Sequence, residues 1–193
     1  MSEKLKILSL HRMGPPWLYR NAVEELEFMM SSFGSNHFQV THDGGLAFPA
    51  YLTDISWDAI ILGSTFLCKR NHPEEFQQCL EEYSWIADSS AIKIALPQDD
   101  YECSEILDQW MVDWNLDLVM SVLPEYMDVI YPKYSKKGSV EAAFTGYVTD
   151  SFIDKTSAFR LFEDRVVDVA YRASALPANF GRMGLLKQEI GDR

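Results

Sequence analysis

The sequence predicts an α/β fold, with a doubly wound and mostly parallel sheet flanked by helices. Two observations indicate this fold. Short apolar runs of strand length recur along the chain, and segments with apolar residues three or four positions apart separate them. Strands that alternate with helical segments form βαβ units and a parallel sheet. Several of the apolar runs also end abruptly in Gly, Asp or Ser, as strands do where they meet a loop.

The expected strands are short and rich in Ile, Leu and Val. Residues 92–96 give the sharpest example, because the apolar run there stops in Pro97 and Gln98. Residues 5–10 are similar, and both runs read as apolar on both faces. We therefore expect these two strands at the centre of the sheet. The other expected strands are residues 38–42, 58–62, 116–122 and 140–148.

Helical spacing predicts the elements between the strands. A helix that starts at Trp17 has one apolar face and ends before Gly34, a common residue after a helix end. Pro73 opens the helix after the third strand, at a position that proline favours. Apolar residues at helical spacing from Ile106 to Trp114 predict the helix after the fourth strand.

Composition and charge limit the classes of function. The chain has 193 residues, of which 47% are hydrophobic and 24% charged, as in ordinary globular proteins. The net charge of −12 argues against nucleic-acid binding, because contacts to phosphate backbones need clustered Lys and Arg. The sequence contains neither an apolar span of transmembrane length nor a signal-peptide pattern. We therefore expect a cytoplasmic protein without a transmembrane segment.

The common motifs for cofactors and metals are absent from the sequence. Neither the G-x-G-x-x-G pattern nor the G-x-x-x-x-G-K-[ST] pattern occurs. The three cysteines and four histidines lack the spacing of metal ligands. The acidic pair Asp99-Asp100 is adjacent and not spaced as in a D-x-D metal motif. We expect no cofactor, no metal and reduced cysteines.

Polar residues follow the expected strands. Loops after parallel strands lie at the carboxyl edge of the sheet, where ligands of doubly wound proteins bind. His11 follows the first strand and Asp99 the fourth, and each is a candidate catalytic base for a hydroxyl group. Each candidate has a simpler alternative. His11 would be an exposed histidine in a loop, and Asp99 or Asp100 would cap the helix that follows. The candidate substrate-binding residues are Gly14, Trp17, Asp43, Gly63, Gln98, Asp100 and Tyr101.

Several short motifs resemble bacterial glycosyltransferases of the GT-B type, which consist of two Rossmann-like domains. These motifs are Gln98 to Tyr101, Tyr131-Pro132, residues 145–148 (TGYV), residues 167–172 (VDVAYR), Leu176-Pro177, Gly181 and Lys187. In such enzymes the N-terminal domain holds the acceptor and the C-terminal domain holds the nucleotide-sugar donor.

The resemblance implies three parts. Residues 1–150 would be the acceptor-side domain, residues 151–165 a connector, and residues 166–193 the opening elements of a second, incomplete α/β domain. A strand-like run at residues 166–170 would begin that second domain. The complete protein would bind a nucleotide-sugar donor and an acceptor, whereas this chain alone would be inactive. Donor-side positions would be Arg172, Gly181 and Lys187.

A second interpretation stays open. The chain would then be a non-catalytic Rossmann-like or flavodoxin-like module that binds a ligand or a partner. This interpretation explains the predicted sheet equally well, because one fold can carry many functions.

Overall fold

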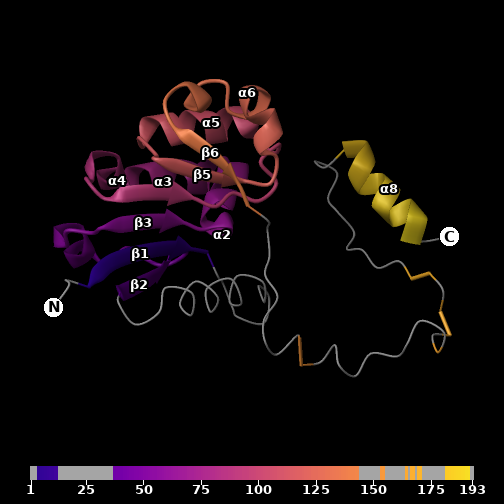
Figure 1. Cartoon of the computed structure of the whole chain (residues 1–193), viewed down its shortest axis with the longest axis horizontal. Coiled ribbons are helices and arrows are strands. Elements are labelled where there is room, and N and C mark those ends of the chain that lie inside the picture. The colour runs from indigo at the N-terminus through magenta and orange to yellow at the C-terminus, as the bar shows by residue number, and fades with distance from the viewer. Residues whose placement is uncertain are drawn as a thin grey trace. The chain divides into compact units, whose positions relative to one another are not determined.

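The computed structural model describes residues 4–12, 37–143 and 181–191, together with residues 153, 154, 164, 166, 167, 169 and 170 (Figure 1). The chain divides into two compact units, Met1–Thr149 and Asp150–Arg193. The first unit contains the sheet. The helix α8 (Gly181–Gly191) belongs to the second unit. None of the described helices has the length and apolar character needed to span a membrane.

The first unit is built on a six-stranded sheet with the order β2-β1-β3-β4-β5-β6, and its pairings are parallel. This confirms the predicted α/β fold. The two strands expected at the centre, β1 and β4, each have a neighbour on both sides. The strands are β1 (Leu5–His11), β2 (His37–Asp43), β3 (Ala59–Leu62), β4 (Ile92–Ala95), β5 (Leu118–Ser121) and β6 (Ser139–Ala142).

Helices follow the strands from β2 onward and bury one face of the sheet. Side chains from these helices join strand residues such as Leu8, Ile60 and Leu62 in one apolar core. Successive right-handed crossovers in one direction across a sheet place their helices on the same face. The helices are η1 (Ala50–Asp54), α2 (Ser64–Leu67), η2 (Cys68–Asn71), α3 (Pro73–Glu82), α4 (Trp85–Asp88), α5 (Ser104–Asp113), η3 (Pro124–Tyr126), α6 (Met127–Ile130) and η4 (Tyr134–Lys136).

Two aspartates fix the start of the strand ladder. Asp58 stands directly before β3, and its carboxylate accepts a hydrogen bond from the Lys6 amide at 2.7 Å. Asp117 stands directly before β5, and its carboxylate accepts one from the Lys93 amide at 2.8 Å. Each aspartate therefore joins its own strand to a neighbour at the edge opposite the carboxyl ends.

The strand β4 differs from the expected pattern of burial. Ile92 is 57% exposed, whereas Lys93 is only 5% exposed. The Lys93 ammonium donates to the carbonyl oxygens of Ala87 and Ser89, both at 3.2 Å. The lysine stem can therefore lie in the apolar core while its charge binds the carbonyls at the end of α4.

Parts of the expected second domain differ or lie outside the described residues. The described residues of 166–170 are exposed and form no strand, because no described strand pairs with them. The prediction of a strand there is wrong for these residues. The strand expected at 140–148 is represented by β6, which ends at Ala142. The helix expected from Trp17 and the residues 144–150 lie outside the described part of the chain.

The burial of β3 and β4 leads to a matched prediction. Leu62 is fully buried, and Leu62→Ala should lower the free energy of unfolding by about 2–5 kcal/mol, because it removes packed atoms and leaves a cavity. Ile92→Ala should cost less than about 1 kcal/mol, since the side chain is already in contact with solvent. Urea unfolding followed by circular dichroism measures both. Equal losses of unfolding free energy in the two variants would contradict the burial of Leu62 and the exposure of Ile92.

Candidate functional site at the carboxyl edge

The carboxyl ends of β2, β1 and β3 lie side by side. His11 is opposite Asp43 in the parallel register, and the Gly63 amide donates to the Leu10 carbonyl at 2.9 Å. The chain steps outward from β1 to β2, then crosses back to β3 and continues in the other direction. The carboxyl edge between β1 and β3 is therefore the switch point at which doubly wound sheets bind ligands. There the Arg12 amide donates to the Thr65 hydroxyl at 3.0 Å.

His11 is fully buried at this switch point. Its ring lies against Gly63, where an added Cβ would be 2.6 Å from Nδ1. Neither ring nitrogen has a hydrogen-bond partner among the residues that the structure describes. Burial lowers the pKa of His11 to about 4, and the nearby Asp43 carboxylate opposes this shift only in part. The ring is thus neutral at pH 7, and the alternative of an exposed loop histidine is wrong. A catalytic role stays a prediction, and it requires that the ring become accessible to substrate.

A buried arginine fixes the loop after β4. Arg70 is 1% exposed, and its guanidinium donates to four backbone carbonyls. These bonds hold the loop in a shape in which Asp99 has a φ of +54°. The acceptors are the carbonyl oxygens of Leu67 at 2.9 Å, Gln98 at 3.2 Å, Asp99 at 3.0 Å and Glu102 at 3.0 Å.

Asp100 points inward from this loop and is fully buried. Its Oδ2 atom accepts hydrogen bonds from the Ser121 hydroxyl at 2.6 Å and from the Tyr131 hydroxyl at 2.8 Å. Burial, together with the Asp100 charge, raises the pKa of Tyr131, so that the phenol stays protonated and donates. Asp100 therefore ties the loop after β4 to the end of β5 and to the segment after α6. The Tyr131 bond joins a residue of the Gln98–Tyr101 motif to a residue of the Tyr131-Pro132 motif.

Gln98, Asp99 and Tyr101 face outward from the same loop. Tyr101 is 62% exposed, and its hydroxyl donates to Asp99 Oδ1 at 3.2 Å. Neither aspartate caps α5, because the N-cap residue is Cys103 and no side chain caps the helix. The capping alternative is therefore wrong. Asp99 and Tyr101 form a polar pair at the surface, and their predicted roles in catalysis and binding stay predictions.

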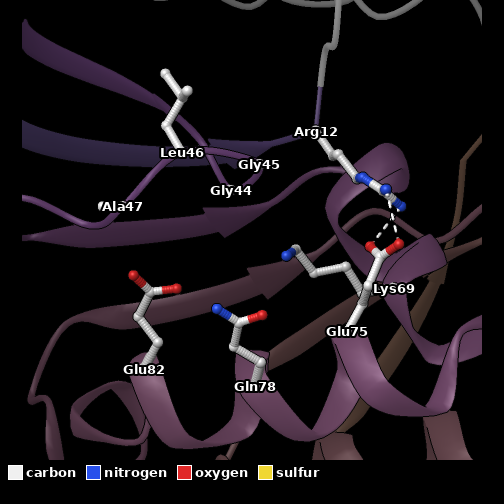
Figure 2. A pocket seen from close by; sticks show the side chains of 9 residues that line it. All are labelled: Arg12, Gly44, Gly45, Leu46, Ala47, Lys69, Glu75, Gln78 and Glu82. Carbon is white, nitrogen blue, oxygen red and sulfur yellow. Dashed lines mark hydrogen bonds and ion pairs between the residues drawn. The ribbon is translucent and has the colours of Figure 1, made fainter.

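A pocket of about 340 Å³ lies beside the switch point (Figure 2). Arg12 comes from the end of β1, four residues follow β2, Lys69 comes from η2, and three polar residues come from α3. Figure 2 shows the α3 side chains extending toward the loop after β2. The lining residues are Arg12, Gly44, Gly45, Leu46, Ala47, Lys69, Glu75, Gln78 and Glu82.

Hydrogen bonds and an ion pair fix two sides of the pocket. The Arg12 guanidinium binds the Glu75 carboxylate through two contacts, at 2.8 and 2.9 Å. Glu82 Oε1 accepts a hydrogen bond from the Phe48 amide at 2.8 Å. These contacts orient Glu75 and Glu82 before any ligand arrives.

Gly44 lets the loop after β2 approach the floor of the pocket. A Cβ at this position would lie 2.8 Å from the Phe66 ring and 3.2 Å from Lys69 Cε. Any larger residue would therefore push the loop away from both side chains.

The pocket and the residues predicted from the sequence are neighbours, but they are different sets. None of the predicted site residues that the structure describes lines the pocket. Gly14, Trp17 and Arg172 lie outside the described residues, and Gly181 and Lys187 are exposed on α8 in the second unit.

Sequence reasoning missed the residues from η2 and α3. One signal was present, because Glu75, Gln78 and Glu82 repeat at a spacing of three and four beside the apolar stripe of the same helix. A second signal was the basic pair Lys69-Arg70 within a buried segment.

The described residues give no sign of a metal or redox site. No group of three or more His, Cys, Asp or Glu side chains is arranged to hold a metal within this part of the chain. Cys68, Cys79 and Cys103 form no disulfide. Comparisons with family models, curated proteins and solved structures find no match to the chain.

The buried Asp100 cluster can be tested by removing one hydroxyl. Tyr131→Phe should lower the free energy of unfolding by about 1–3 kcal/mol, because it leaves a buried carboxylate with one hydroxyl donor in place of two. Tyr126→Phe is the matched control, since Tyr126 is 54% exposed and water can replace its hydroxyl contacts. Chemical unfolding at pH 7 measures both variants. Equal free energies of unfolding for Tyr131→Phe and Tyr126→Phe would argue against a stabilising hydrogen bond between Tyr131 and Asp100.

The buried His11 predicts a specific loss of stability in acid. Its pKa is about 4 in the folded protein and near the ordinary value of 6.5 in the unfolded chain. The contribution of His11 is therefore complete above pH 6.5 and is lost as the pH falls toward 4, by about 3 kcal/mol in all. Urea unfolding between pH 7.5 and 4.5 measures how the free energy of unfolding changes with pH. That change should be smaller for His11→Leu than for the wild type. The exposed control His72→Leu should follow the wild type, and a wild-type slope in both variants would contradict the assignment.

Proposed function

We propose that the first unit is the acceptor-binding half of a glycosyltransferase of the GT-B type, which transfers sugar from a nucleotide-sugar. The motifs around Gln98, Tyr131 and Gly181 suggest this family. The observation that carries the proposal is the polar pocket beside the switch point. Ligands of doubly wound sheets bind at this place, and a few convergent polar groups in a concave site are typical of a binding site.

The lining of the pocket suits a sugar. Each sugar hydroxyl both donates and accepts hydrogen bonds, and the pocket presents donors and acceptors together in the Gln78 amide and the Glu82 carboxylate. Leu46 is exposed at the pocket and offers apolar contact to the carbon-bound hydrogens of a ring.

The loop after β4 supplies the second part of the proposal. Arg70 and Asp100 hold this loop rigidly, while Asp99 and Tyr101 face outward. Asp99 is therefore the more accessible of the two candidate bases, and His11 is the buried one. In enzymes of this type, a donor domain binds the nucleotide-sugar.

One observation favours a second candidate function. The strand order β2-β1-β3-β4-β5 is that of flavodoxin-like folds, in which a mononucleotide binds at the β1/β3 switch point. In that case the unit would be a non-catalytic ligand-binding module. Titration with flavin mononucleotide separates the two functions, because an acceptor-binding unit should not bind it.

Sugar binding can be measured directly with the full chain. Saturation-transfer NMR against methyl glucoside, galactoside and mannoside should show contact with at least one of them. Gln78→Ala should weaken that binding by about 3- to 10-fold, because a neutral hydrogen bond is lost. Gln77→Ala is the matched control on the same helix, since Gln77 does not line the pocket. Absence of sugar binding, or flavin binding in its place, would overturn the proposal.

A further inference from the structure

Lys69 is an unusual residue in the floor of the pocket. It is only 6% exposed, and its ammonium lies 5.9 Å from the centre of the Phe66 ring. Within the described residues this ammonium makes no hydrogen bond and has no carboxylate within ion-pair distance. Figure 2 shows the side chain extending from η2 into the space between the Gly44–Gly45 loop and α3.

The other charges of the pocket have partners. Arg12 and Glu75 neutralise each other, and Glu82 accepts a backbone hydrogen bond. The Lys69 stem is buried, whereas its ammonium lines the pocket and has no carboxylate partner among the described residues. This charge is therefore available to an anionic ligand that enters the pocket.

The surroundings of Lys69 restrict the anion to a single negative charge. A phosphate dianion is normally held by several cations or by a set of free backbone amides. Here the amides of Gly44, Gly45 and Leu46 already donate to His11 and Asp43. The Glu82 carboxylate also lines the pocket and would repel a dianion more strongly than a monoanion. One ammonium beside a carboxylate and an amide suits a carboxylate group that carries neighbouring hydroxyls.

We propose that this pocket binds a sugar acid, with the ligand carboxylate on Lys69 and ligand hydroxyls on Gln78 and Glu82. This inference rests on the proposed function and names the class of its acceptor. The volume of about 340 Å³ lies at the small end of ligand pockets, which range from about 300 to 1,000 Å³. The pocket thus has room for one sugar ring.

The test compares two ligands that differ only at the sixth carbon. Isothermal titration of the full chain should show tighter binding of methyl β-D-glucuronide than of methyl β-D-glucoside. Lys69→Met keeps the apolar stem and removes the charge, and it should weaken glucuronide binding by about 10- to 100-fold, as loss of a charge-assisted hydrogen bond does. Glucoside binding should change little. Lys137→Met is the matched control, because Lys137 is exposed and does not line the pocket.

Two further measurements extend the test, and the first needs no variant. In the wild type, glucuronide affinity should fall as salt rises, while glucoside affinity should not. Without ligand, Lys69→Met should melt at the same temperature as the wild type or higher, since the Lys69 charge has no ion pair to lose within the described residues and the methionine keeps the apolar stem.

The outcomes separate the inference from the proposed function. If glucoside binds and glucuronide binds no tighter, the inference fails while acceptor binding stands. If neither sugar binds, both fail. Tighter binding of inorganic phosphate than of glucuronide would overturn the sugar-acid assignment, and so would a Lys69→Met variant that binds glucuronide as the Lys137→Met control does.

Discussion

Arg70 organises the carboxyl edge of the sheet. Its guanidinium is buried and is occupied by carbonyl oxygens from the end of α2 and from the loop after β4. A buried guanidinium is tolerated only when its donors are used, and the carbonyls of two loops use them here. The shape of the loop after β4 directs Asp100 inward, toward Ser121 and Tyr131. The same shape leaves Asp99 and Tyr101 at the surface. Lys69, which precedes Arg70 in the sequence, lines the pocket.

Two residues at this edge carry buried polar atoms without a hydrogen bond in the described part of the chain. They are His11, with both ring nitrogens, and Asp100, with its Oδ1 atom. At the opposite edge, Asp58 and Asp117 accept hydrogen bonds from strand amides. Proteins keep local conflicts mainly where function requires them. The unsatisfied atoms of His11 and Asp100 are such conflicts, and both residues lie at the carboxyl edge.

The acceptor proposal and the sugar-acid inference concern the same pocket but depend on different side chains. The pocket needs only polar side chains at a switch point to bind a sugar, whereas selectivity for an acid needs the charge of Lys69. The Arg12–Glu75 pair contributes rigidity and little net charge. Gly44 permits the close approach of the loop to Phe66 and Lys69, so the fit of the pocket depends on a residue without a side chain.

The sequence by itself determined the α/β class, the strand positions in the first unit and the edge at which polar residues collect. These features follow from local periodicity, since apolar runs and helical spacing are properties of neighbouring residues. The strand order, the inward turn of Asp100, the burial of His11 and the pocket on α3 were decided by tertiary structure. Each depends on residues distant in the chain, such as Tyr131 for Asp100 and Gly63 for His11. Lys93 and Ile92 show the same limit, because only the packing of α4 against the sheet made the lysine the buried member of the pair.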